Sequence, residues 1–196
     1  FAYRDSIFKR TRMPGGGATG RYVVLSVTFQ HHLGSLSAPV RYAQLAERLG
    51  IEPGQRAPMR EVREAVLDIR ARKGMVLDEN DHDTWSAGSF FTNPILTHEE
   101  AARLPEAAPR YEAEGGIKTS AAWLISHSNL ERGFTLTPDR RGAALSTKHS
   151  LALTNRGEAT SEDIAQLANH VRSVVHDRFG VWLEPEPVRL NVRIGA

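Results

Sequence analysis

The spacing of apolar side chains divides the chain into a small number of short elements. In residues 21–30 apolar and polar side chains alternate, and this period of two predicts a half-buried strand. We expect another strand over residues 181–194, interrupted by Pro185 and Pro187, and a short one over residues 151–153. The strands are few and stand far apart in the sequence.

Helical spacing of apolar side chains is clearest in residues 161–179. Thr160 is the expected N-cap, Asp163 stands three residues later, and Gly180 is the expected stop. Shorter helices are predicted over residues 42–49, 58–72, 98–104 and 120–126. Because strands and helices do not alternate regularly, the pattern favours an α+β fold, with a mostly antiparallel sheet and packed helices, over a doubly wound sheet.

Composition narrows the class of protein. The 196 residues are 40% hydrophobic and 24% charged, which is ordinary for a globular protein. The absence of cysteine excludes disulfides, thiolate metal sites and a cysteine nucleophile, and no apolar run approaches the roughly 20 residues that cross a membrane. The net charge of +2 is small and its basic residues are scattered, so we expect neither a nucleic-acid nor a membrane partner.

Two patterns invite a ligand-binding interpretation that their context does not favour. Residues 15–20 satisfy the G-x-G-x-x-G spacing, but a dinucleotide site needs a strand before it and a helix after it, and here a predicted strand follows. We interpret them as a flexible connector. Neighbouring strand histidines such as His31 and His32 point to opposite faces, and residues 81–83 lack a third histidine nearby. We therefore expect solvated polar residues rather than a metal site, with an exposed loop over residues 77–87.

The stretch Gly88-Ser89-Phe90-Phe91-Thr92-Asn93-Pro94 carries the chain's clearest candidate for chemistry. Ser89 is one of few side chains that could serve as a positioned proton donor. The glycine lets backbone approach, the two rings would exclude water, and the Asn93 amide could orient a ligand. The alternative interpretation is a plain turn that enters a buried strand.

Arg72-Lys73 stands before this stretch. Four further segments accompany it in a fixed order along the chain. They are Tyr3-Arg4-Asp5-Ser6, Arg41-Tyr42-Ala43-Gln44-Leu45, Ile117-Lys118-Thr119-Ser120-Ala121-Ala122-Trp123-Leu124-Ile125 and Phe179-Gly180-Val181-Trp182-Leu183-Glu184-Pro185-Glu186. Together they resemble the C-terminal portion of the UDP-N-acetylenolpyruvoylglucosamine reductase family. Because Tyr42 is present, the chain is similar to the subgroup with an active-site tyrosine loop.

The resemblance implies a cytoplasmic enzyme of peptidoglycan precursor synthesis. Such an enzyme uses NADPH and FAD to reduce UDP-N-acetylenolpyruvoylglucosamine to UDP-N-acetylmuramate, and its partner is this UDP-sugar. Residues 1–36 would be the end of an FAD-binding lobe and a connector, and residues 37–196 a C-terminal substrate-binding domain. The family's N-terminal flavin-binding region has no counterpart, so we expect a portion of a longer protein. The sequence leaves the FAD-binding residues and the oligomeric state open.

Catalytic roles follow from the resemblance for three residues. Arg4 would contact the enolpyruvyl carboxylate, for which its planar fork is suited. Ser89 would protonate carbon, and Glu186 would help Arg4 to stabilise the developing enolate. Glu184 is an alternative to Glu186, since both point to the same side of an extended strand. Pro187 departs from the common family pattern, in which valine follows the second glutamate.

The resemblance also implies substrate contacts. The positions concerned are Tyr3, Tyr42, Lys73, Asn93, Lys118 and His149. Tyr42 would cover the substrate and move for nicotinamide, while Lys73 and Lys118 would meet the diphosphate. From the residues alone, Lys73 could equally be a helix-terminal cation and His149 a strand-edge histidine.

Two other functions remain open at this point. One is a UDP-sugar-binding domain without redox activity. The other is a structural relative that keeps the motifs but has lost the activity.

Overall fold

The computed structural model describes residues 6–11, 20–137, 141–189 and 191–195. The chain forms two compact units. One comprises Phe1–Val66 with Val188–Asn191, and the other Leu67–Pro187 with Val192–Ala196. The expected division into residues 1–36 and 37–196 concerned a flavin lobe and stays a prediction.

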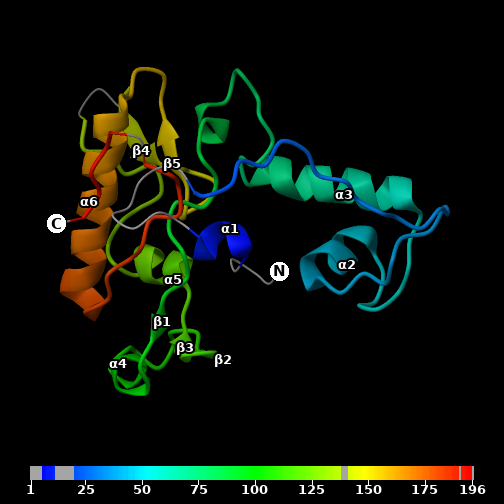
Figure 1. Ribbon diagram of the computed structural model, residues 1–196, viewed down its shortest axis with the longest axis horizontal. Coiled ribbons are helices and arrows are strands. Elements are labelled where there is room, and N and C mark those ends of the chain that lie inside the picture. Colours follow the sequence, from blue (N-terminus) through cyan, green and yellow to red (C-terminus); the bar gives the residue numbers. More distant parts are fainter. Residues whose placement is uncertain (1–5, 12–19, 138–140, 190, 196) are drawn as a thin grey trace. The chain divides into compact units, whose positions relative to one another are not determined.

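Short helices and strands follow one another along the chain (Figure 1). The helices are α1 (Ile7–Arg10), α2 (Ala43–Leu49), α3 (Met59–Arg72), α4 (His98–Ala102), α5 (Ala121–Ser126) and α6 (Ser161–Phe179), with a 3₁₀ turn η1 (His82–Thr84). The strands are β1 (Ile95–Leu96), β2 (Tyr111–Ala113), β3 (Gly116–Lys118), β4 (Ala143–Leu145) and β5 (Leu153–Asn155). The helices α2 to α6 lie within about two residues of their predicted bounds, α1 was not predicted, and β5 lies two residues later than predicted.

The first unit contains α2 and most of α3, joined by a connection whose backbone is tied to the preceding loop. Val40 N donates to Gln55 O at 2.8 Å, and Ser37 N donates to Ala57 O at 2.9 Å. The helix α2 ends at Gly50, whose φ of 66° is the left-handed conformation expected of a C-terminal glycine. The described buried side chains here are few and small, mainly valine and alanine.

The prediction of a half-buried strand over residues 21–30 is wrong. Leu25 is 92% exposed and Phe29 is 73% exposed, and neither belongs to a strand. A strand needs a neighbour that takes up its N–H and C=O groups. Among the described residues, no backbone hydrogen bond outside helices and strands involves residues 22–34. Residues 22–34 therefore have no described backbone partner, although the Tyr22 ring lies edge-to-face against Phe8 at 6.1 Å.

The second unit is built around α6, which begins and ends as predicted. Thr160 and Asp163 form a reciprocal capping box, and Gly180 ends the helix with φ 71°. One face of the helix is fully buried and packs on β4 and β5 (Figure 1). In the part of the chain that the structure describes, no helix is both long and apolar enough to cross a membrane.

Both sheets are antiparallel. β3 lies between β1 and β2, with Ile117 opposite both Leu96 and Glu112. β4 and β5 pair through Ala144 and Thr154. Small antiparallel sheets with separate packed helices make an α+β fold, so the predicted fold class is confirmed.

The prediction of a strand over residues 181–194 is wrong. Val181 and Leu183 are buried as expected, but the described residues of this segment make only one isolated bridge, between Pro185 and Phe91. Proline has no N–H to donate to a ladder, so Pro185 and Pro187 prevent continuous pairing.

Candidate active site

Two buried rings fix the segment that carries Ser89. Phe90 and Phe91 are 4% and 1% exposed, and their ring centroids lie 5.2 Å apart in an edge-to-face arrangement. Gly88 has a φ of 80°, a left-handed conformation that favours glycine at this turn. The rings pack into the core, and Ser89 remains partly exposed beside them.

Phe90 bonds through its backbone to a segment on each side. Its N–H donates to Leu151 O at 2.8 Å, and its carbonyl accepts the N–H of Glu186 at 2.8 Å. Leu151 follows the turn that carries His149. Ser89 therefore lies between the segment that contains His149 and the segment that contains Glu186.

The Ser89 hydroxyl faces an imidazole. Ser89 Oγ and His149 Nε2 are 3.4 Å apart, so the hydroxyl donates to the ring or accepts from it according to the tautomer. The structure thus brings together two residues that are separated by 60 positions in the sequence.

The surroundings of His149 favour the neutral form of its imidazole. Burial lowers the pKa of its imidazole, and the nearby cations Lys73 and Arg132 lower it further. Lys73 directly follows α3 and precedes Gly74, whose φ is 67°. Both cations are thus close enough to His149 to disfavour a third positive charge.

The two candidate glutamates have different surroundings. The Glu184 side chain is 74% exposed, and its carboxylate lies 4.0 Å from the Arg172 guanidinium. Glu186 is partly buried, and its N–H bonds to Phe90. The Glu184 carbonyl instead accepts the N–H of Thr92 at 3.0 Å. Of the two, Glu186 is bound to the residue adjacent to Ser89.

Asn93 and Lys118 make contacts that a sequence pattern does not indicate. Asn93 Oδ1 accepts the N–H of Ala121 at 3.0 Å and so caps the first turn of α5. The Lys118 ammonium lies 5.9 Å from the ring centroid of Tyr111 on the neighbouring strand β2. A ligand at these positions would use the Asn93 amide nitrogen and the Lys118 ammonium.

The interpretation of residues 81–83 as solvated polar side chains is wrong for Asp83. This residue is only 5% exposed, although the loop around it is largely open to solvent. Asp83 Oδ1 accepts hydrogen bonds from Thr147 N at 2.8 Å and from the Arg156 guanidinium at 3.1 Å. These partners lie more than 60 residues away in the sequence, so no local pattern could indicate them.

Buried donors also set the ionisation of Asp83. Burial acts to raise the pKa of its carboxyl, but hydrogen bonds from Thr147 and Ser146 and the charge of Arg156 outweigh burial. The pKa of Asp83 therefore lies below its ordinary value, and the group is a carboxylate.

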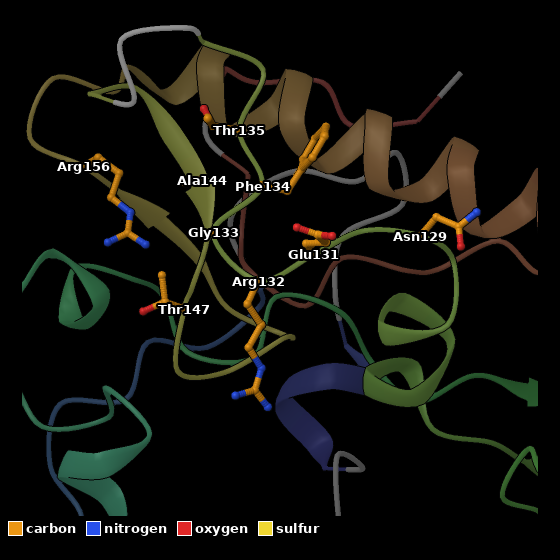
Figure 2. A pocket seen from close by; sticks show the side chains of 9 residues that line it. All are labelled: Asn129, Glu131, Arg132, Gly133, Phe134, Thr135, Ala144, Thr147 and Arg156. Carbon is orange, nitrogen blue, oxygen red and sulfur yellow. The ribbon is translucent and has the colours of Figure 1, made fainter.

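A cavity of about 670 Å³ opens beside this region (Figure 2). It is lined by Asn129, Glu131, Arg132, Gly133, Phe134, Thr135, Ala144, Thr147 and Arg156. Figure 2 shows the Phe134 ring and the Arg132 guanidinium pointing in opposite directions. No sequence pattern indicated Arg132, because an arginine in a Leu-Glu-Arg-Gly loop carries no spacing that marks a site.

Three predicted site residues cannot be placed with the others. Tyr3 and Arg4 lie outside the described residues, as do residues 15–19 of the glycine-rich segment. Tyr42 precedes α2 in the first unit, and its side chain is 80% exposed. Within the described ranges, no group of three or more histidine, aspartate or glutamate residues could hold a metal.

Comparison with known proteins gives the family. Residues 79–190 match the model of the UDP-N-acetylenolpyruvoylglucosamine reductase C-terminal domain. The chain belongs to the UDP-N-acetylenolpyruvoylglucosamine reductase family. The resemblance inferred from five short segments is thereby confirmed.

Curated reductases of this name match nearly the whole chain. The reductase of Cutibacterium acnes is 54% identical over 188 residues, which cover 95% of this chain and 47% of the relative. That of Streptomyces coelicolor is 52% identical over 206 residues, covering 99% of this chain and 51% of the relative. That of Mycobacterium avium is 48% identical over 202 residues, covering 99% and 54%. The chain spans about half the length of these relatives.

Proposed function

We propose that this chain is the substrate-binding portion of a reductase that converts UDP-N-acetylenolpyruvoylglucosamine to UDP-N-acetylmuramate. The observation that carries the proposal is the pairing of Ser89 with His149, beside the segment that holds Glu186. Reduction of a carbon–carbon double bond by hydride also needs a proton delivered to the second carbon. The hydroxyl, imidazole and carboxyl groups of this site are suited to that step.

The hydroxyl, imidazole and carboxyl groups of this site fit a flavin enzyme. In such an enzyme the flavin delivers hydride and protein groups deliver the proton. Bound FAD, reduced by NADPH, would supply the hydride to the vinyl carbon. We assign no residue of this chain to holding FAD or NADPH. The part of the chemistry that we assign to this chain is binding the UDP-sugar, stabilising negative charge and delivering the proton.

Ser89 is the proposed acid. Its O–H bond would break as a C–H bond forms on the carbon that carries the developing negative charge. The serine alkoxide would then regain a proton from His149 or from water, since a hydroxyl is an intrinsically weak acid. Glu186, in protonated form, and Arg4 would stabilise the enolate before protonation, and one such group is typically worth on the order of 3–4 kcal/mol.

The substrate's diphosphate would lie near Lys73 and Arg132. Both cations act on the pKa of His149, so positive charge gathers on this side of the imidazole. Two cations suit a group with two negative charges. Asn93, Lys118, Tyr3 and Tyr42 remain proposed substrate contacts, with Tyr42 as the residue that covers the substrate.

The alternative function is a UDP-sugar-binding domain without redox activity. The observation that supports this alternative is that the chain spans about half the length of its relatives. Purified full-length protein separates the two. Visible flavin absorbance that NADPH bleaches supports the reductase, whereas colourless protein that still binds the UDP-sugar supports the binding domain.

The role of Ser89 is tested by replacing it with alanine in the full-length reductase. Ser89→Ala should leave NADPH-dependent flavin reduction nearly intact and slow reoxidation by the enolpyruvyl substrate by about 100-fold or more, because protonation of carbon belongs only to the second half-reaction. Stopped-flow absorbance measures the two half-reactions separately.

Ser173→Ala is the matched control for Ser89→Ala, since Ser173 is an exposed residue of α6. It should change neither half-reaction. Equal slowing of both half-reactions by Ser89→Ala would contradict the assignment of Ser89 as the acid.

A further inference from the structure

The turn that joins β4 to β5 and carries His149 is held by one buried carboxylate. Asp83 Oδ1 accepts the backbone N–H of Thr147 at 2.8 Å, and Oδ2 accepts the Thr147 hydroxyl. Within the turn, Ser146 Oγ accepts the backbone N–H of His149 at 3.1 Å. The carboxylate thus fixes backbone that lies two residues before His149.

Asp83 is itself fixed from two other directions. The Arg156 guanidinium, on the residue after β5, donates to Oδ1 at 3.1 Å. Behind it, a Cβ built on Gly74 would lie only 2.8 Å from the Asp83 carbonyl oxygen, so the two backbones are in close contact. Asp83 therefore has little freedom, and neither has the turn that it binds.

Burial of a carboxylate destabilises the fold unless hydrogen-bond donors and an opposite charge compensate for the lost water. Here the two carboxylate oxygens accept from a backbone N–H, a hydroxyl and a guanidinium. An asparagine at this position would offer one accepting oxygen and would turn an NH₂ group toward one of those donors. The cluster at Asp83 therefore requires a carboxylate.

We infer that Asp83 is a positioning residue for the reduction, holding the β4–β5 turn so that the imidazole of His149 faces the Ser89 hydroxyl. The inference rests on the proposed function for the role of His149. Asp83 contacts neither Ser89 nor His149 through any described hydrogen bond, and acts through Thr147 and Ser146. Loss of the two accepting carboxylate oxygens of Asp83 would let the turn move, and this movement would separate His149 from Ser89.

The direction in which the pKa of His149 changes distinguishes a positioning role of Asp83 from a purely electrostatic one. The groups that act on this imidazole are its own burial and the cations Lys73 and Arg132, which together lower its pKa. A loosened turn would expose the imidazole, and its pKa would rise toward the ordinary value of 6.5. Removal of a nearby negative charge without movement would instead lower the pKa further.

Asp83→Asn in the full-length, flavin-loaded reductase is the test. The pKa of His149 is read from its Cε1–H resonance across pH, and the two half-reactions are followed by stopped-flow absorbance. We expect the pKa to rise, reoxidation by the enolpyruvyl substrate to slow about 10- to 100-fold, and flavin reduction by NADPH to stay unchanged.

Asp81→Asn is the matched control, because it removes the same charge from the same loop. Asp81 pairs with the flexible ammonium of Lys148, and its Oδ1 accepts the N–H of Asp83 at 3.0 Å, a bond that the Oδ1 of asparagine can keep. Among the described hydrogen bonds Asp81 accepts none from the backbone of the β4–β5 turn, and its side chain is 27% exposed. In this variant the pKa of His149 should stay or fall slightly, and both half-reactions should stay within about two-fold. A rise as large as that of Asp83→Asn would overturn the inference.

Thr147→Val covers the case in which Asp83→Asn does not fold. It removes the hydroxyl that Oδ2 accepts and keeps the backbone N–H bond, at a residue that is exposed. We expect a smaller rise in the pKa of His149 and a smaller loss in the second half-reaction. An unchanged or lowered pKa in both variants would overturn the positioning role.

The two proposals fail in distinguishable ways. A raised pKa of His149 with an unchanged second half-reaction supports the positioning of the turn and rejects His149 as the partner of Ser89. A slowed second half-reaction with an unmoved or lowered pKa overturns the positioning role and leaves the proposed function standing.

Discussion

Glu184 and Glu186 illustrate how two identical residues, two positions apart, acquire different surroundings. An extended strand would send both to the same side, so the sequence could not choose between them. The structure has no strand here, and Glu184 lies in solvent near Arg172. Glu186 is bonded to Phe90, which adjoins Ser89. These surroundings favour Glu186 as the proposed catalytic carboxyl group.

Glu186→Gln should therefore slow the second half-reaction of the full-length reductase by at least about 100-fold, on the scale of losing a group that stabilises the transition state. Glutamine keeps the shape and can donate a hydrogen bond, but it lacks the acidic proton with which a protonated Glu186 would stabilise the developing enolate. Glu184→Gln is the matched control and should have a much smaller effect. The measurement is the rate of flavin reoxidation by the enolpyruvyl substrate.

Two results would change this interpretation. A modest effect of Glu186→Gln would mean that the site requires hydrogen bonding rather than proton transfer. A severe effect of Glu184→Gln would mean that the assignment is wrong by two residues, with the surroundings of Pro187 as the cause.

At the scale of elements, the sequence predicted those whose signals are local. The N-cap, capping box and terminal glycine of α6 are all within one or two turns of the helix, and its bounds were predicted correctly. Similar local signals located α2 and α3, where Gly50 and Gly74 follow the last turns. Capping chemistry requires no knowledge of distant partners.

Elements that depend on distant partners were predicted poorly. Residues 21–30 have the alternation of a strand but no described neighbouring strand, and β2 and β3 form where the sequence shows no alternation. The same limit applies to the site. Ser89 and His149 were each identified, but their pairing and the buried cluster around Asp83 join residues more than 50 positions apart.

The contrast between α6 and residues 21–30 gives a stability prediction for this 196-residue chain. Leu167→Ala should lower the free energy of unfolding by about 2–5 kcal/mol, because Leu167 is fully buried on α6 and its loss leaves a cavity. Leu25→Ala removes the same atoms from a side chain that is 92% exposed, and should change the free energy of unfolding by less than about 0.5 kcal/mol. Urea unfolding followed by circular dichroism at 222 nm measures both.

A large loss of stability in Leu25→Ala would show that residues 21–30 pack against part of the chain. In that case the alternation would have predicted the segment correctly, and the exposed arrangement would be wrong.

At the scale of the whole molecule, the described residues of the candidate site other than Tyr42 belong to one compact unit, Leu67–Pro187 with Val192–Ala196. Ser89, His149, Glu186 and Asp83 all belong to it, although Asp83 lies in η1 and the other three lie in separate loops. Folding of this unit and assembly of the site are therefore one event. Ionisation of the site must then affect the stability of the unit.

The direction of that effect follows from the pKa values. Those of His149, Asp81 and Asp83 all lie below their ordinary values in the folded chain. The folded state then binds fewer protons than the unfolded state wherever these groups titrate, so stability rises with pH there. For His149 the contribution is complete above its unfolded pKa, near 6.5, and is lost as the pH falls through its folded pKa. The aspartates act in the same direction in a lower range, below about pH 4.

We therefore expect the free energy of unfolding of this chain, measured in urea, to decrease as the pH falls from 7.5 to 5. His149→Gln should show a shallower decrease over this interval, because glutamine can keep a hydrogen bond to Ser89 without taking up a proton. The difference between the two slopes isolates the contribution of His149, since the other titrating groups are common to both proteins. Parallel slopes would show that the imidazole is not held neutral by the fold, and the proposed exchange of a proton with Ser89 would lose its physical basis.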